Sequence, residues 1–258
     1  MIWKFRSKTL TLDIPIWMGI VNVTPDSFSD GGQFFEPSSA VEQALRLIQD
    51  GAGIVDLGGE STRPGSKDIS AEEELRRVLP VLRQLRKLQP DIPISVDTTK
   101  VEVAREVLAA GADIINDVSG LSDPEMLSVL KKTGAGYCLM HTQGTPQTMQ
   151  NNPQYGDVVA EVFAFLKERR EMMIDCGIEP EAIAVDPGLG FGKTFAHNWQ
   201  LVDNIAHFHR LGATLLVGHS RKRFISETFA DREAGTRQVS RQLIESGVHI
   251  LRVHHFNG

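Results

Sequence analysis

Eight short apolar runs in this chain end on, or close to, polar side chains that could do chemistry. These side chains are Asn22, Asp56, Asp97, Asn116 with Asp117, His141, Asp186, Ser220, and Arg252 with His254. A single polar residue after a buried run is often only a helix cap or a loop residue. Packing alone does not require the pattern eight times, so the set predicts a shared polar pocket.

Three of these residues suit a flat heterocycle that is rich in N–H donors. Asp97, Asn116 and Asp186 carry carboxylate and amide groups. A carboxylate can accept two parallel hydrogen bonds from the amino-amidine edge of an aminopyrimidine, much as it does from a guanidinium. A metal site built on Asp97 and Asp186 is the alternative. The chain lacks the close His and Asp spacings typical of a metal cage, which makes that alternative weaker.

Basic side chains stand near the same ends. They are Arg63, Arg221, Lys222, Arg223, Arg252 and His254. Positive groups around such a pocket favour an anionic leaving group, such as phosphate or pyrophosphate. The Ser220–Arg221 pair is also predicted to open a helix, whose amino end attracts anions. A solvated basic turn is the simpler interpretation of these residues on their own.

Two glycine-rich loops could approach a ligand. Asp186–Lys193 (DPGLGFGK) is similar to a phosphate-binding loop. Its spacing from Gly188 to Lys193 is one residue shorter than in the phosphate-loop motif GxxxxGK(S/T). We interpret it as a tight turn that brings backbone and Phe191 against a flat ligand. Asn22–Gly32 (NVTPDSFSDGG) is longer than most strand-to-helix connections and carries Phe28, which favours a lid over the substrate.

The elements that must position these residues alternate along the chain. Nearly continuous apolar character predicts buried parallel strands. The strands are expected at Trp17–Asn22, Gly53–Gly58, Pro93–Asp97, Asp113–Asp117, Gly136–His141, Ala182–Asp186, Ala213–Gly218 and His249–His254. Start and stop residues predict helices between them. The helices are expected at Ser39–Asp50, Ser70–Leu88, Val101–Ala110, Asp123–Lys132, Val158–Cys176, Asn198–Arg210, Arg221–Phe229 and Thr236–Ser246.

Eight such alternations in 258 residues predict an α/β fold, a (β/α)8 TIM barrel that uses residues 1–258 as a single domain. Residues 1–15 are expected to form an N-terminal β-hairpin that closes the bottom of the barrel. A doubly wound sheet is the competitor, but no Gly-rich dinucleotide turn follows the first strand. The helices expected at Arg221–Phe229 and Thr236–Ser246 both belong to the crossover before the last strand. The eighth helix of the barrel would have to follow that strand, and too few residues remain for it. We expect either a barrel that closes without this helix or a natural chain that continues past Gly258.

Composition narrows the class of protein. The chain has 27 basic and 33 acidic residues, a formal net charge of −6, which argues against a nucleic-acid binder held by bulk electrostatics. No apolar run approaches the roughly 18 residues of a membrane helix. The only cysteines are Cys138 and Cys176, which favours a reducing, cytoplasmic location.

Seven segments in order resemble the dihydropteroate synthase family, from about Trp17 to His254. They are NVTPDSFSDGG, DLGGESTRPG, SVDT, IINDVSG, DPGLGFGK, GHSRK and RVH. The resemblance implies a Mg²⁺-assisted enzyme of folate biosynthesis and a target of sulfonamides. Its reaction would join 6-hydroxymethyl-7,8-dihydropterin pyrophosphate to p-aminobenzoate, giving 7,8-dihydropteroate and pyrophosphate.

The resemblance also implies roles for individual residues. The pterin would be bound by Asp97, Asn116, Asp186 and Lys222. Pyrophosphate would be bound by Asn22, Thr62, Arg63, Arg252 and His254, with Asn22 also holding Mg²⁺. p-Aminobenzoate would be bound by Ser27, Phe28, Arg63, Pro64, Phe191, Ser220 and Lys222, with Asp30 on the closing loop. The catalytic residues would be Asp97, Asp186, Lys222 and Arg252.

Two features depart from the family pattern. His219 stands where a small or aliphatic residue is expected, and Thr236–Ser246 is unusually polar for a helix that contributes to a homodimer in the family. Three rival functions stay open. They are a methyltetrahydrofolate-dependent methyltransferase barrel, a Schiff-base aldolase that uses Lys193 or Lys222, and a pterin-binding paralogue without turnover.

Overall fold

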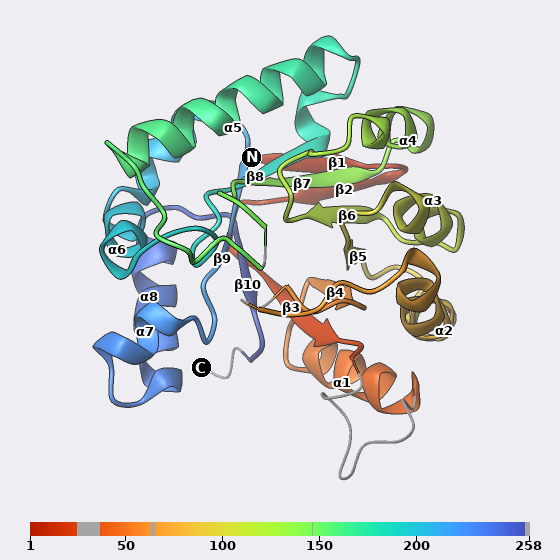
Figure 1. The fold of residues 1–258 in the computed structure, drawn as a ribbon. Helices are drawn as coiled ribbons and strands as arrows, with labels where there is room; N and C mark the ends of the chain where they lie inside the picture. Colours follow the sequence, from red (N-terminus) through yellow and green to blue (C-terminus); the bar gives the residue numbers. More distant parts are fainter. Residues whose placement is uncertain (25–36, 63–64, 146, 256–258) are drawn as a thin grey trace.

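A closed barrel of eight parallel strands forms the centre of the molecule (Figure 1). The computed structural model describes residues 1–24, 37–62, 65–145 and 147–255. The barrel strands are β3 (Ile16–Asn22), β4 (Ile54–Gly58), β5 (Ile94–Asp97), β6 (Ile114–Asp117), β7 (Gly136–Met140), β8 (Ile183–Asp186), β9 (Thr214–Gly218) and β10 (Ile250–Val253). Each strand pairs with its neighbour in sequence, and β10 closes the barrel by pairing with β3. The predicted TIM barrel is therefore confirmed.

Helices surround the barrel on its outside (Figure 1). They are α1 (Pro37–Gln49), α2 (Ala71–Leu88), α3 (Val101–Ala109), α4 (Glu125–Thr133), α5 (Val158–Asp175), α6 (Phe195–Asp203), α7 (Arg223–Thr228) and α8 (Arg232–Glu245). The described residues also include two short 3₁₀ segments, η2 (Pro180–Ala182) and η3 (Ile205–Leu211). No residue between β10 and His255, where the described chain stops, lies in a helix.

The single helix predicted over Asn198–Arg210 is wrong. The chain forms α6 and then η3, with a break at Asn204. The Asn204 side-chain amide donates to the Gln200 carbonyl at 2.8 Å. Asparagine competes in this way for the carbonyls of the last helical turn, which ends α6 there.

The N-terminal hairpin closes the amino end of the barrel, as predicted. Strands β1 (Ile2–Phe5) and β2 (Lys8–Thr11) pair antiparallel. The rings of Trp3 and Phe5 are buried and meet edge to face, with their centroids 5.4 Å apart. The Trp3 indole donates to the Ala182 carbonyl at 3.0 Å, just before β8. Because Ala182 lies at the amino end of that strand, the hairpin covers the end opposite to the polar residues.

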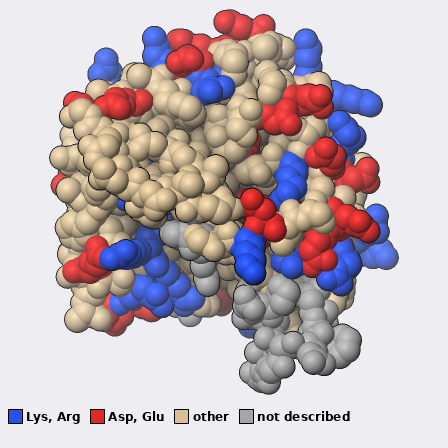
Figure 2. Space-filling view, in the orientation of Figure 1, with Lys and Arg blue, Asp and Glu red and all other residues tan. Residues whose placement is uncertain are grey.

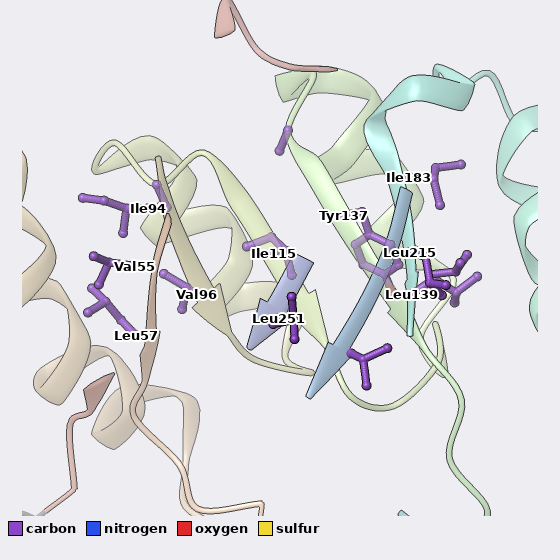
Figure 3. Packing of buried hydrophobic residues seen from close by; sticks show 14 of the residues in the cluster. Val55, Leu57, Ile94, Val96, Ile115, Tyr137, Leu139, Ile183, Leu215 and Leu251 are labelled. Atoms are coloured by element: carbon purple, nitrogen blue, oxygen red, sulfur yellow. The ribbon is translucent and has the colours of Figure 1, made fainter. Parts of the chain in front are cut away.

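The buried strands present two different faces. Figure 3 shows outward side chains such as Val55, Leu57, Val96 and Leu139, which belong to a core cluster with helix residues. The inward side chains nearest the hairpin are apolar too, and they form a second cluster with Trp3 and Phe5. This inner cluster contains Met18, Ile54, Ile114, Cys138, Ala184, Leu216 and Ile250. Two positions further along four of these strands, the inward residues become polar. They are Asp56, Asn116, Asp186 and Arg252.

Charges of both signs are interspersed over the face seen in Figure 2. This agrees with the absence of a strong single-sign excess in the sequence. No helix in the described parts of the chain is both long and apolar enough to cross a membrane.

Candidate active site

The Arg252 guanidinium links two aspartates across the barrel. Its Nε donates to Asp56 Oδ2 at 2.7 Å, and its terminal nitrogen donates to Asp97 Oδ2 at 2.8 Å. The Asn116 amide reaches the same Asp56 oxygen at 3.4 Å. Strands β4, β5, β6 and β10 thus meet through their side chains at the carboxyl end of the barrel, where TIM barrels carry their active sites.

Burial shifts the proton affinity of this cluster. It raises the pKa of Asp97 to about 7, against the lowering effect of the Arg252 charge and with a further increase from Asp56. Burial also disfavours the charged form of Arg252, but the charges of Asp56 and Asp97 outweigh it and raise the pKa of the guanidinium. Asp97 therefore changes its charge near neutral pH, while Arg252 stays positive.

Backbone amides fix both carboxylate oxygens of Asp186. Gly188 N–H donates to Oδ1 at 2.8 Å, and Gly218 N–H donates to Oδ2 at 3.2 Å. Burial raises the pKa of Asp186, and the nearby charge of Lys222 opposes this shift. Because two elements hold it, the carboxylate keeps a defined direction at the end of β8.

The loop after Asp186 packs tightly against β7 and Lys222. Gly188 has φ 71°, and a Cβ at this position would lie 1.9 Å from the His141 carbonyl oxygen. Lys222 Nζ donates to the Leu189 carbonyl and lies 4.5 Å from the centroid of the Phe191 ring. Burial lowers the pKa of Lys222 to about 8, and the charge of Asp186 opposes this shift. The close turn expected from the glycines is thus present, and it brings Phe191 and Lys222 together.

A buried lysine–histidine pair supports the same loop, and the sequence did not predict it. Lys193 Nζ lies 2.9 Å from His141 Nδ1 and donates to the Phe191 carbonyl at 2.9 Å. Burial lowers the Lys193 pKa well below its usual range. Burial, followed by the charge of Lys193, lowers the pKa of His141 to about 3. Lys193 is 2% exposed, and these two bonds hold the loop together.

Ser220 and His254 are in direct contact, although the resemblance assigns them to different substrates. Ser220 Oγ lies 3.0 Å from His254 Nδ1 and accepts from the His254 backbone N–H at 3.3 Å. Either the hydroxyl or the ring nitrogen can be the donor of the bond between them. The ends of β9 and β10 are joined by this contact.

The remaining predicted residues divide into two groups. Asn22 ends β3 beside Gly58, and its Oδ1 lies 3.9 Å from where a Cβ on Gly58 would stand. Thr62 is half-buried in the segment after β4. The others lie outside the described residues, and they are Ser27, Phe28, Asp30, Arg63 and Pro64.

Two details of the sequence analysis are corrected here. Ser220–Arg221 does not open a helix, because Arg221 is left-handed with φ 59° and α7 begins only at Arg223. Asp117 does not share the pocket with Asn116, since neighbouring strand residues point to opposite faces. Its carboxylate accepts from Tyr137 Oη at 2.5 Å and from the Ser119 backbone N–H at 2.7 Å.

Comparison with known proteins agrees with this geometry. A family described as "pterin binding enzyme" matches residues 18–254. The dihydropteroate synthase of Escherichia coli K12 is 46% identical over 253 residues, which cover 96% of this chain and 89% of that protein. The chain belongs to the dihydropteroate synthase family.

Solved dihydropteroate synthases share the fold closely. The Yersinia pestis enzyme in a sulfonamide drug complex has a TM-score of 0.92 and 41% identity, covering 99% of this chain and 94% of that one. The Xanthomonas albilineans enzyme with 4-aminobenzoic acid has a TM-score of 0.89 and 45% identity, covering 95% of this chain and 89% of that one. Relatives at this level of identity favour the synthase over the methyltransferase-type barrel.

The described residues offer little to a permanently bound metal ion. They contain no group of three or more His, Cys, Asp or Glu side chains arranged to hold one. Asp97 bonds to Arg252 and Asp186 bonds to backbone amides, so the alternative of a metal held by both is not supported. Asn22 supplies one amide oxygen, which fits Mg²⁺ that arrives with substrate phosphates, because this ion often takes few protein ligands.

Proposed function

We propose that this protein is a dihydropteroate synthase. It would condense 6-hydroxymethyl-7,8-dihydropterin pyrophosphate with p-aminobenzoate and release 7,8-dihydropteroate and pyrophosphate. One observation carries the proposal: Asp97, Asn116 and Asp186 lie at the carboxyl ends of β5, β6 and β8, with Lys222 bonded to the loop after β8, in a chain that is 46% identical to a named synthase. The E. coli protein and the two solved enzymes described above bear the same name.

The pterin ring is the part of the substrate that the buried carboxylates suit. Asp97 and Asp186 would accept hydrogen bonds from the amino and ring N–H groups of the pterin, with Asn116 beside them. When the C–O bond to pyrophosphate breaks, positive charge develops on the pterin. Fixed carboxylates in a buried site stabilise such a charge without having to reorganise. Asp97 does this only in its ionised form, which its pKa of about 7 allows near neutral pH.

The leaving pyrophosphate would be met by the cationic and polar side chains at the ends of β3, β4 and β10. We assign these contacts to Asn22, Thr62, Arg63, Arg252 and His254. Mg²⁺, when bound to the pyrophosphate, would neutralise part of its charge, and Asn22 is the residue we propose to hold it. Arg252 keeps its positive charge throughout, so it can stabilise the leaving group at any working pH.

The arylamine would enter from the side of Phe191 and Lys222. We assign the p-aminobenzoate contacts to these two, to Ser220, and to Ser27, Phe28, Arg63 and Pro64. Sulfonamides would bind in the same place, since the Y. pestis relative is described with such a drug. The arylamine attacks the pterin carbon directly, so the protein positions and neutralises and no side chain acts as a covalent nucleophile.

Release of pyrophosphate tests this function. The purified protein is expected to release pyrophosphate only when Mg²⁺, the pterin pyrophosphate and p-aminobenzoate are all present, with omission of each as the control. Absence of release from the complete mixture would refute the synthase. Tight binding of the pterin pyrophosphate with no release would instead identify a paralogue without turnover.

Three further expectations belong to the same proposal. Residues 1–258 would form one pterin-binding domain, with the hairpin as part of it. The free cysteines Cys138 and Cys176 are compatible with a cytoplasmic enzyme. A homodimer through the last helices is proposed from the family, and sedimentation would measure it.

A further inference from the structure

The turn from His219 to Lys222 contains a strained residue next to the substrate-binding side chains. Arg221 adopts φ 59°, a region that non-glycine residues occupy at a cost of about 1–2 kcal/mol. Such residues persist only where the surroundings hold them firmly. On either side of it, Ser220 contacts His254 and Lys222 bonds to Leu189. The backbone of Arg221 therefore sets how these two side chains are placed relative to each other.

One face of α8 makes three contacts with this turn. Glu233, Thr236 and Ser240 share that face, because residues three and four apart are neighbours on a helix. Glu233 Oε1 accepts from Arg221 Nε at 2.7 Å. Thr236 Oγ1 accepts from the Arg221 backbone N–H at 3.4 Å. Ser240 Oγ lies 2.7 Å from His219 Nε2.

The two hydroxyls on α8 also bond within their own helix. Ser240 Oγ lies 2.9 Å from the Thr236 carbonyl, and Thr236 Oγ1 lies 2.8 Å from the Arg232 carbonyl. A hydroxyl that donates to a carbonyl of its own helix is left to accept toward the turn. In that arrangement, His219 carries its ring proton on Nε2 and donates to Ser240. Its Nδ1 is buried and has no hydrogen-bond partner in the described part of the chain.

The helix that presents these acceptors is itself held in place. A Cβ on Gly235 would lie 2.5 Å from the Phe229 ring and 2.8 Å from an Ile225 methyl, so α8 approaches α7 as closely as a glycine allows. His219 is fully buried, and burial keeps its pKa at about 4, so the ring stays neutral and Nε2–H remains a donor at working pH.

We propose that His219 is a positioning residue, and that its bond to Ser240 fixes the Ser220–Lys222 turn against the polar face of α8. This inference rests on the proposed function, because Ser220 and Lys222 are the residues assigned to the substrates there. It also joins the two departures from the family pattern. The unexpected histidine, His219, bonds to Ser240, which lies in the unusually polar helix.

Four single variants of the protein, and the double variant of His219→Met with Ser240→Ala, test the role of this bond. His219→Met keeps the volume but removes the donor, Ser240→Ala removes the acceptor, and His219→Gln keeps an N–H donor near the same place. Ser128→Ala is the matched control, since Ser128 is an exposed serine in α4 whose hydroxyl donates only to the Glu125 carbonyl.

We expect His219→Met and Ser240→Ala each to raise the KM for p-aminobenzoate about tenfold with a change in kcat below about threefold. His219→Gln should recover most of the loss, and Ser128→Ala should behave as wild type. The double variant should be little worse than either single one, because both remove the same bond. The proposal would be overturned if the effects of His219→Met and Ser240→Ala on KM were additive in the double variant. It would also be overturned if Ser240→Ala had the same KM as Ser128→Ala.

Urea unfolding of the same variants separates this inference from the proposed function. Non-additive losses of unfolding free energy in the His219→Met and Ser240→Ala cycle support the bond, and additive losses contradict it, whether or not the protein is a synthase. If His219→Met does not fold, the comparison of Ser240→Ala with Ser128→Ala still decides the KM effect. A wild-type protein that released no pyrophosphate would refute the function alone.

Discussion

Replacing Gly188 by alanine should lower the activity strongly. A glycine with a similar φ but no close neighbour should tolerate the same substitution. At φ 71°, an alanine costs about 1–2 kcal/mol for its left-handed backbone. Its Cβ would also lie 1.9 Å from the His141 carbonyl oxygen, whereas real Cβ contacts essentially never fall below 3.0 Å. Because the obstacle is backbone, the loop must move by roughly 1 Å, since close-packed interiors have no room to absorb the clash.

That movement would directly reach two groups that we propose to bind substrate, Asp186 and Lys222. Gly188 N–H holds one oxygen of Asp186, and the next residue, Leu189, accepts from Lys222. A misplacement of about 1 Å at reacting groups can cost on the order of 100-fold in rate. We therefore expect kcat/KM, measured by pyrophosphate release, to fall about 100-fold in Gly188→Ala.

Gly212→Ala is the matched control for this prediction. Gly212 has φ 62°, and a Cβ there would meet nothing within 4 Å. It carries nearly the same backbone cost without the contact, so it should lose stability in urea unfolding by about 1–2 kcal/mol and keep its activity. Equal stability and equal kcat/KM in the two variants would refute the reasoning.

Three other predictions use the same purified protein. Asp97→Ala should weaken binding of the pterin pyrophosphate roughly 100-fold, because charge-assisted hydrogen bonds are lost, and unchanged affinity in calorimetry would contradict the assignment. The pH profile of kcat/KM should be bell-shaped, because activity falls below about 7 as Asp97 gains a proton and above about 8 as Lys222 loses one. A flat profile from about pH 6 to 9 would show that these groups do not act in the assigned charge states. Tyr137→Phe should cost about 1–3 kcal/mol of unfolding free energy, since Asp117 loses a buried partner, while pterin affinity stays unchanged because both face away from the pocket.

The barrel was predictable because its strands and helices leave local marks in the sequence. Runs such as Ala182–Asp186 are too apolar for a half-exposed sheet, and glycine or proline ends most of the stretches between them. The observed helices differ from the predicted ones at two places. Asn204 ends α6 through its own amide, and Arg221 delays α7 by its left-handed φ. The first of these could have been suspected from the asparagine, but the second depends on contacts with α8 that local sequence does not encode.

The positions of candidate site residues were more predictable than their partners. The alternation of side chains along a strand separates Asn116 from Asp117 once the strand is recognised. It equally marks Asp56 as inward, two residues beyond Ile54. Asp56 was expected in the shared polar pocket, but the sequence predicted no substrate contact or catalytic role for it. The bonds from Arg252 to Asp56 and Asp97 depend on barrel closure, which brings residues 196 and 155 positions apart into contact. The contact between Lys193 and His141 likewise joins residues that are far apart in the sequence.

These long-range bonds make the charged residues a single coupled unit. The positive charge of Arg252 is the largest influence that lowers the Asp97 pKa, whereas Asp56 raises it. Removing Arg252 would therefore favour protonation of Asp97. The pterin would then lose the negative charge of Asp97, although Asp97 itself is not substituted. If the proposed contacts hold, a loss of activity in an Arg252 variant would combine a missing pyrophosphate contact with an altered pterin site. The contribution of each residue to the activation free energy therefore cannot be assigned from single variants. Double-variant cycles would measure the coupling free energy between the residues.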